Sequence, residues 1–187
     1  MDALLRGLYA AEYARRDNTP CLIEEGLFLG SVGAAFRRDA LKELNVTHIL
    51  TVAKSLEPAF PNDFVYKKIE VLDSPYMDLA QHFDACIEFI DEARREGGAV
   101  LVHCFAGRSR SVTIVAAYLM KKHHMSVYEA LTQVKIKRPQ ISPNHGFIQQ
   151  LEAFERLLRA PKLSWLTLSC DDVCFHPAHA DAETSEK

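Results

Sequence analysis

The sequence predicts an α/β protein in which helices cover both faces of a central, mostly parallel β-sheet. Apolar, β-branched segments of strand length alternate along the chain with longer segments whose apolar residues recur every three or four positions. In addition, the segment AVLVH (99–103) is apolar almost throughout, which is typical of a strand buried on both faces of a parallel sheet. Alternating strands and helices of this kind form layered α/β structures.

The chain begins with a predicted N-terminal extension, residues 1–20, which has the pattern of a short and weakly amphipathic helix. The sequence Asn-Thr-Pro at 18–20 ends it. Two short strands are predicted in the segment CLIEEGLFLGS, one on each side of a glycine turn. A short helix follows, and Asp39 is placed to cap it.

The middle of the chain continues the alternation. Residues 46–53 and 64–73 are predicted strands, and the second runs into the acidic, turn-rich loop DSPYMD. Residues 79–98 follow as an amphipathic helix, because apolar residues recur at i, i+3, i+4 and i+7 from Phe83 onwards. The two glycines at 97–98 end this helix.

Three further helices are predicted after the central strand. The segment VTIVAAYLMKK is apolar on nearly all sides, which indicates a buried helix. Ser126 and Glu129 form the capping box of the next helix, which Pro139 ends. Asn144 is placed to cap the last helix.

Composition and charge limit the function classes. The predicted domain comprises residues 21–160, and the polar, aperiodic residues 161–187 are expected to be a disordered tail. The net charge of −3 provides no basic field, so nucleic acid is not an expected partner. No apolar run approaches the ~20 residues that span a membrane, so no membrane association is expected. Without an export signal, the five cysteines are expected to be reduced, in the cytoplasm or nucleus.

The reactive residues are concentrated in the segment HCFAGRSRS (103–111), where the central strand meets the buried helix. Cys104 lies at the carboxyl end of that strand, where α/β sheets bind ligands. The loop after it can direct peptide N–H groups at one anion, and the positive end of the next helix faces the same way. The planar Arg110 guanidinium can bind two phosphate oxygens. The predicted phosphate-binding residues are Phe105, Ala106, Gly107, Arg108, Ser109 and Arg110.

The same positive field acts on the cysteine sulfur. A helix N-terminus and nearby cations favour the thiolate, which is the nucleophilic form, so Cys104 is the predicted nucleophile. Ser111 can donate a hydrogen bond to the thiolate and assist its departure from a phospho-cysteine. A single cysteine on a buried strand is usually a small apolar residue. The spacing His-Cys-x5-Arg-Ser across a strand, a loop and a helix favours catalysis instead.

The segment VLVHCFAGRSRSVTIVAAYLM resembles the signature of the cysteine-dependent dual specificity protein phosphatases. The segments GLFLGS, NVTHILTVA, AYLMKKH and PNHGFIQQL are similar too, so the resemblance covers residues 21–158. It is closest to the small plant members, which resemble MAP-kinase phosphatases without their docking domain. The resemblance implies a protein tyrosine phosphatase-like fold, no metal or other cofactor, and a shallow site for phosphotyrosine, phosphoserine and phosphothreonine. Phosphorylated proteins, MAP kinases among them, are the implied partners.

The resemblance also implies roles for individual residues. By motif position, Cys104 is the nucleophile, Arg110 the phosphate clamp and Ser111 the hydroxyl partner, while His103 orients the loop. The general acid is implied at Asp73.

Two residues near the motif leave questions open. Asp78 competes with Asp73 for the role of acid, although it is well placed to cap the helix that follows. Arg108 departs from the family pattern, in which an uncharged residue is common at this position. It either faces solvent or favours acidic or doubly phosphorylated substrates.

Alternatives remain for the function and for several side chains. A phosphatase of this fold could act on phosphoinositides or RNA 5′-phosphates, and a non-catalytic relative could only bind phosphoproteins.

Calmodulin could bind the N-terminal extension, and Cys86 could pack in the core or pair with an oxidised Cys104. The basic run KIKRP (135–139) is expected to be a solvated helix end, or otherwise a contact for an acidic or phosphorylated partner. The group Cys170, Cys174, His176 and His179 is too closely spaced for zinc, so no metal site is predicted.

Overall fold

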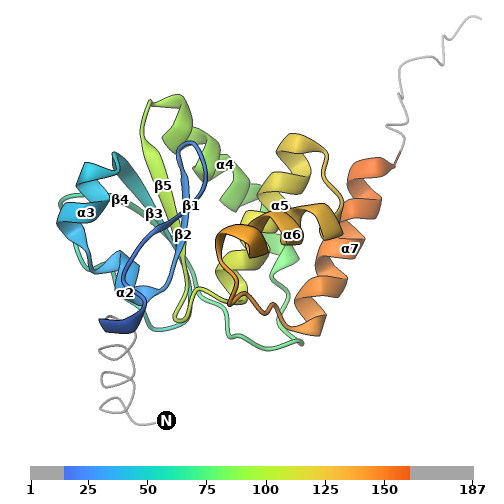
Figure 1. Ribbon diagram of the computed structural model, residues 1–187. Coiled ribbons are helices and arrows are strands. Elements are labelled where there is room, and N and C mark those ends of the chain that lie inside the picture. The colour runs from blue at the N-terminus through green and yellow to red at the C-terminus, as the bar shows by residue number, and fades with distance from the viewer. Residues whose placement is uncertain (1–14, 161–187) are drawn as a thin grey trace, which may run out of the picture.

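The computed structural model describes residues 15–160, which form the layered α/β structure that the sequence predicts (Figure 1). Within these residues, five strands make one sheet in the order β1-β2-β5-β3-β4. Only β1 and β2 pair antiparallel, and the other neighbours pair parallel. The strands are β1 (Cys21–Glu24), β2 (Leu27–Gly30), β3 (Val46–Val52), β4 (Val65–Ile69) and β5 (Ala99–His103). The predicted mostly parallel sheet is confirmed.

Helices cover both faces of the sheet. The helices are α2 (Val32–Ala35), α3 (Arg38–Glu43), α4 (Phe83–Arg95), α5 (Arg110–His123), α6 (Val127–Lys137) and α7 (His145–Arg159), with a 3-10 turn, η1 (Ala80–His82), before α4. Leu101 of β5 packs in one apolar cluster with Ala35 and Leu41, so α2 and α3 lie on that face. Its neighbours Val100 and Val102 face the larger cluster, which α4, α5, α6 and α7 complete.

The two helix N-caps that the sequence predicts at Ser126 and Asn144 are present in the structure. The Ser126 hydroxyl accepts from the Glu129 N–H at 3.2 Å, and the Glu129 carboxylate accepts from the Ser126 N–H at 2.7 Å. The Asn144 side chain accepts from the Phe147 N–H at 3.0 Å and starts α7. Both predicted caps are therefore confirmed.

Two local predictions differ from the structure, and one short helix was not predicted. Arg37, not Asp39, is the residue before α3, and Asp39 lies exposed in its first turn, 3.8 Å from Arg38. β4 ends at Ile69 rather than at residue 73, because its only partner, β3, ends at Val52 opposite Ile69. The short helix α2, which Ser31 caps, was not predicted, because four residues are too few to show a period.

Several predictions concern other parts of the chain. Within residues 15–160, no helix is long and apolar enough to cross a membrane. The N-terminal extension falls mostly, and the tail with its cysteine and histidine group wholly, outside these described residues, so these predictions stay predictions.

Candidate active site

The predicted reactive segment forms a loop between the end of β5 at His103 and the start of α5 at Arg110. Cys104 opens this loop, and only 1% of its surface is exposed. Its sulfur accepts hydrogen bonds from the Gly107 N–H and the Ser111 hydroxyl, each at 3.2 Å. Two hydrogen-bond donors are therefore directed at this sulfur. Residues 104–110 are called the cysteine loop below.

The carbonyl groups of the cysteine loop point outwards. Each carbonyl of residues 105–109 accepts a hydrogen bond of 2.7–3.2 Å from outside the loop. The donors are Val32 N–H for Phe105, the Arg138 guanidinium for Ala106 and Gly107, Ser142 N–H for Arg108 and Thr113 N–H for Ser109. In a trans peptide the N–H lies opposite the carbonyl. The N–H groups of residues 106–110 therefore face the inside of the loop, above the Cys104 sulfur.

Gly107 is required at its position for two reasons. Its φ of +62° lies in the left-handed region, which strains other residues. A Cβ there would also stand 2.4 Å from the Gly30 carbonyl oxygen at the end of β2. Only glycine lets the loop pass this closely over the sheet.

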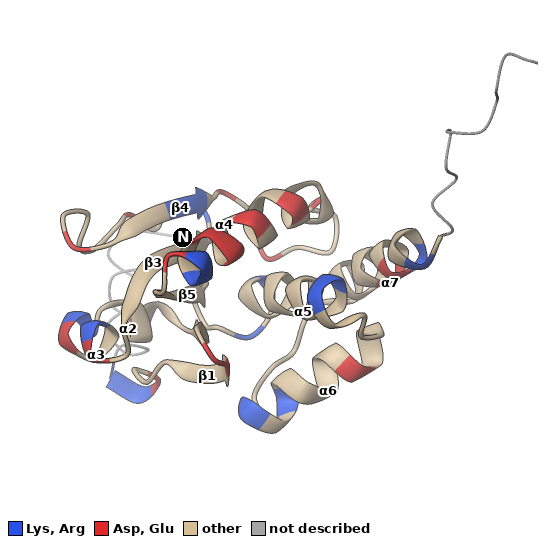
Figure 2. Ribbon diagram, turned by 90° about the horizontal axis from the view of Figure 1, so that it is seen from above, with Lys and Arg blue, Asp and Glu red and all other residues tan. Residues whose placement is uncertain are grey.

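Arg138 directly follows α6 and supports the loop, so the predicted solvated helix end is confirmed for Lys135 and Lys137 but wrong for Arg138. Its side chain is 4% exposed and its Nε donates to the Gly107 carbonyl at 2.8 Å. Lys135 and Lys137 at the end of α6 are exposed, and Figure 2 shows the basic residues at this end of the helix. The buried positions of α6 include Ala130 and Val134, and residue 138 continues their spacing. That spacing, rather than the charge run, was the signal that could have identified Arg138.

His103 fixes the entry to the loop. The ring lies buried between the Cys104 carbonyl, 3.2 Å from Nδ1, and the Thr51 hydroxyl, 2.8 Å from Nε2. A carbonyl can only accept, so Nδ1 carries the proton and Nε2 accepts from Thr51. Burial lowers the pKa of His103 to about 4, and the nearby Arg110 adds to this effect. His103 is therefore neutral at pH 7 and holds the backbone of Cys104. Thr51, its partner on β3, was missed by the sequence reasoning.

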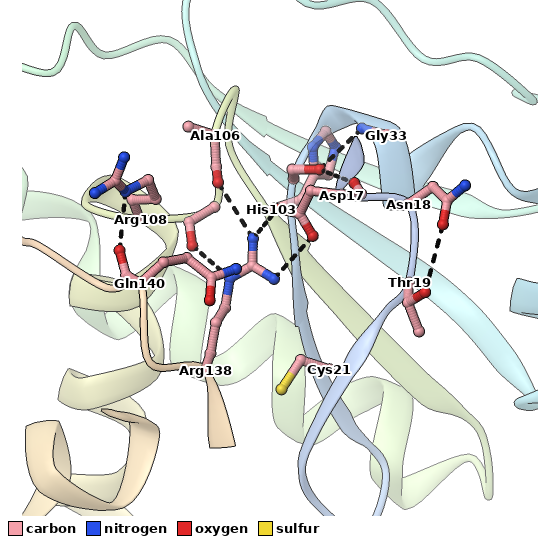
Figure 3. A network of polar contacts seen from close by, with 12 residues as sticks. Asp17, Asn18, Thr19, Cys21, Gly33, His103, Ala106, Arg108, Arg138 and Gln140 are labelled. Atoms are coloured by element: carbon pink, nitrogen blue, oxygen red, sulfur yellow. Dashed lines mark hydrogen bonds and ion pairs between the residues drawn. The ribbon is translucent and has the colours of Figure 1, made fainter. Parts of the chain in front are cut away.

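The two arginines of the loop point in different directions. Arg110 donates from Nη1 to the Val71 carbonyl at 3.1 Å, and its side chain is 12% exposed. Its Nε is buried and makes no hydrogen bond among the described residues, and it forms an ion pair with Asp73. Arg108 is exposed, and its Nε donates to the Gln140 carbonyl at 2.9 Å (Figure 3). The structure therefore turns the Arg110 side chain toward Val71 and Asp73, whereas the Arg108 side chain is exposed and contacts Gln140.

The structure also separates the two competing aspartates. Asp73 lies beside the cysteine loop, where its Oδ1 accepts from the Ser109 hydroxyl at 2.7 Å and from the Asn144 amide at 3.0 Å. Its Oδ2 is 3.6 Å from Arg110 Nε. Asp78 instead accepts from the Gln81 N–H at 3.2 Å at the start of η1. Asn144, predicted only as a cap, is thus a site residue as well.

Comparisons with known proteins agree with this geometry. The family model described as "Dual specificity phosphatase, catalytic domain" matches residues 27–157. The chain belongs to this family. It is 58% identical over 159 residues to dual specificity protein phosphatase 1 of Arabidopsis thaliana, covering 85% of this chain and 80% of that protein. It is 56% identical over 137 residues to dual specificity protein phosphatase 1B of the same plant, covering 73% and 82%.

Among solved structures, the fold is similar to that of the human tyrosine phosphatase-like serine/threonine/tyrosine-interacting protein. The TM-score is 0.74 with 33% sequence identity, and the match covers 76% of this chain and 99% of that one. The predicted resemblance to small plant phosphatases and the predicted phosphatase-like fold are both confirmed. The chain is therefore a dual specificity protein phosphatase, a hydrolase.

Two further predictions concern metal binding and Cys86, the other cysteine of the predicted redox pair. Residues 15–160 contain no group of three or more histidine, cysteine or acidic side chains that could hold a metal ion. Cys86 of α4 is fully buried in the larger apolar cluster, and burial raises the pKa of its thiol to about 12. This burial supports the first of the two interpretations of Cys86, packing in the core, while pairing with an oxidised Cys104 stays a prediction.

Proposed function

We propose that this phosphatase hydrolyses phosphotyrosine, phosphoserine and phosphothreonine in proteins through a phospho-cysteine intermediate. The observation that carries the proposal is the position of the Cys104 sulfur beneath the inward-facing N–H groups of residues 106–110. These donors and the Arg110 guanidinium, whose Nε makes no hydrogen bond among the described residues, are suited to the oxygens of one phosphate group. The sulfur then lies in line for attack on phosphorus.

In the first step, the Cys104 thiolate attacks phosphorus, so an S–P bond forms as the bond to the substrate oxygen breaks. The leaving oxygen needs a proton, and we assign its transfer to Asp73. Among the described residues, hydrogen bonds reach only the Oδ1 of Asp73. In this proposal the Asp73 carboxyl group donates its proton to the leaving oxygen.

In the second step, water attacks the phospho-cysteine, the S–P bond breaks and inorganic phosphate forms. The Asp73 carboxylate, now without its proton, accepts one from the attacking water. The Ser111 hydroxyl donates to the departing Cys104 thiolate, to which it already points in the structure at 3.2 Å. Each group thus returns to its starting state.

We further propose MAP kinases as substrates. The support is the resemblance to MAP-kinase phosphatases and a relative from Dictyostelium discoideum, "MAP kinase phosphatase with leucine-rich repeats protein 3". That protein is 45% identical over 140 residues, which cover 74% of this chain but 16% of its own length. The exposed Arg108 beside the loop is suited to a substrate with a second phosphate or an acidic neighbour.

Rates on matched substrates test the proposed function. We expect phosphate release from phosphotyrosine and phosphothreonine peptides with a MAP kinase activation-loop sequence to exceed release from a short-chain phosphoinositide or a 5′-phosphorylated RNA. The measurement is kcat/KM for inorganic phosphate release from each of the four substrates. Faster turnover of the phosphoinositide or the RNA would replace the proposed substrate class with that one. Binding of the peptides without turnover would indicate a phosphoprotein-binding module.

Exchanging each aspartate for asparagine tests the assignment of the acid. Asp73→Asn is expected to slow hydrolysis of phosphopeptides by about 10²-fold, the lower end of the effect of general acid catalysis. Turnover of p-nitrophenyl phosphate should fall much less, because its leaving group needs little protonation. Initial rates on both substrates give the comparison.

Asp78→Asn is the control, since Asp78 lies in the same loop but only accepts from the Gln81 N–H. It should leave both rates within a few-fold of the unmodified chain. If Asp78→Asn shows the substrate-dependent loss and Asp73→Asn does not, the acid is Asp78.

A further inference from the structure

We propose that Asp17 is a positioning residue for the cysteine loop and acts through Arg138. Asp17 lies before β1 and outside residues 27–157, the part of the chain that matches the family model. The inference rests on the proposed function in one respect, namely that the cysteine loop binds phosphate.

The first link is the ion pair between Asp17 and Arg138. The Asp17 carboxylate binds both terminal nitrogens of the guanidinium, with Nη1 at 3.1 Å from Oδ1 and Nη2 hydrogen-bonded to Oδ2 (Figure 3). Arg138 is 4% exposed and Asp17 22% exposed. A guanidinium buried to this extent requires a partner for its charge, and Asp17 supplies it.

The second link runs from Arg138 to the loop. Its Nε donates to the Gly107 carbonyl at 2.8 Å, and its Nη2 donates to the Ala106 carbonyl at 3.2 Å. These two carbonyls belong to the peptides whose N–H groups, those of residues 107 and 108, face the inside of the loop. One guanidinium thus connects the Asp17 carboxylate to the orientation of two phosphate donors.

A third link reaches the loop from the backbone of Asp17. The Asp17 carbonyl accepts from the Ser31 hydroxyl at 2.5 Å, and the same hydroxyl accepts from the Gly33 N–H and caps α2. The adjacent Val32 N–H donates to the Phe105 carbonyl at 3.1 Å. Asp17 therefore contacts Arg138 through its side chain and Ser31, the neighbour of Val32, through its backbone carbonyl.

Loss of the Asp17 charge has two opposing effects on phosphate binding. Removing a negative charge near the site should strengthen the attraction of an anion. However, it also leaves Arg138 buried without its counter-ion, so the guanidinium is drawn toward water and away from the Ala106 and Gly107 carbonyls. If Asp17 positions the loop, the second effect is larger and phosphate binds more weakly. The sign of the change therefore separates positioning from simple electrostatics.

The test measures the dissociation constant of inorganic phosphate by equilibrium dialysis, with the full chain at pH 7 and well below its unfolding temperature. Asp17→Asn should weaken phosphate binding by about 10-fold, within the range for side chains coupled in one hydrogen-bond network. In the double variant with Arg138→Gln, the loss should not exceed that of Arg138→Gln alone. If Asp17→Asn does not stay folded, Asp17→Ser is measured instead, because its hydroxyl can still accept from Arg138.

Asp63→Asn is the matched control. The Asp63 carboxylate is 19% exposed and pairs with Arg38 through two hydrogen bonds of 2.7 Å, far along the chain from the cysteine loop. This variant should lower the unfolding temperature as Asp17→Asn does, yet leave the phosphate affinity unchanged.

The outcomes are distinct. Unchanged or tighter phosphate binding in Asp17→Asn, or an equal loss in Asp63→Asn, overturns the inference. An unmodified chain that binds no phosphate would contradict both the inference and the proposed function. A chain that binds phosphate but hydrolyses no phosphopeptide would contradict the proposed function alone, because the dialysis experiment does not depend on turnover.

Discussion

Replacing Cys104 with serine is expected to reduce hydrolysis of a phosphotyrosine peptide by at least about 10³-fold while the peptide still binds. The serine hydroxyl stays protonated at neutral pH, so it cannot attack phosphorus in the way proposed for the Cys104 thiolate. The N–H groups of residues 106–110 are held by carbonyl contacts that do not involve the sulfur, so the phosphate site remains. Initial rates and a fluorescence titration with labelled peptide measure the two quantities.

Cys86→Ser provides the control, since Cys86 is also a buried cysteine but packs in the core on α4. It should lower the free energy of unfolding and keep the turnover per folded molecule. Turnover of more than a few per cent in Cys104→Ser would contradict the assignment of the nucleophile. Loss of peptide binding in that variant would show that the sulfur itself supports the loop.

The fold was predictable because its signals are local. Strand β5, the apolar helix α5 and the capping box at Ser126 are each determined by residues that lie close together in the sequence. The His-Cys-x5-Arg-Ser spacing is local too, because one strand, one loop and one helix supply all of it. The prediction therefore placed Cys104, Arg110 and Ser111 together before any long-range contact was known.

The supports of the loop could not be predicted in the same way, because they come from distant segments. Arg138 lies 31 residues after Gly107, and Asp17 lies 121 residues before Arg138. The charge of Arg138 suggested solvent, whereas the carbonyls of the loop and the carboxylate of Asp17 make its burial possible. The charges of the run KIKRP alone do not indicate that Arg138 forms hydrogen bonds and an ion pair with residues from distant parts of the sequence.

The contacts that hold Asp73 at the site also come from distant parts of the sequence. Asp73 and Asp78 both lie within the loop DSPYMD. The sequence favoured Asp73, because it ends a predicted strand and because the family resemblance implies the acid at the first aspartate, whereas Asp78 was placed to cap a helix. Asp73 is held by Ser109 and by Asn144, which lies 71 residues further along the chain. The start of α7 therefore takes part in placing the carboxyl group, which the sequence of the loop alone does not show.

Arg110→Lys is expected to reduce kcat/KM for p-nitrophenyl phosphate by about 10²-fold, similar to the loss of one donor that stabilises a transition state. Lysine keeps the positive charge but replaces a planar fork of donors with a single ammonium group. The Arg110 Nη1 bond to the Val71 carbonyl, which orients the side chain, would be lost as well. Initial rates over a range of substrate concentrations give kcat/KM for both chains.

Arg108→Ala is the informative comparison because it removes a whole charge from the same loop, whereas Arg110→Lys removes none. The Arg108 side chain is exposed and donates to the Gln140 carbonyl, and alanine keeps the backbone N–H of residue 108. Turnover of the small aryl phosphate should therefore stay within a few-fold in Arg108→Ala, with a larger effect on doubly phosphorylated peptides. If net charge were the main contribution of these arginines, Arg108→Ala would be the more damaging change. Equal, large losses in the two variants would contradict the separate roles that the geometry assigns to Arg108 and Arg110.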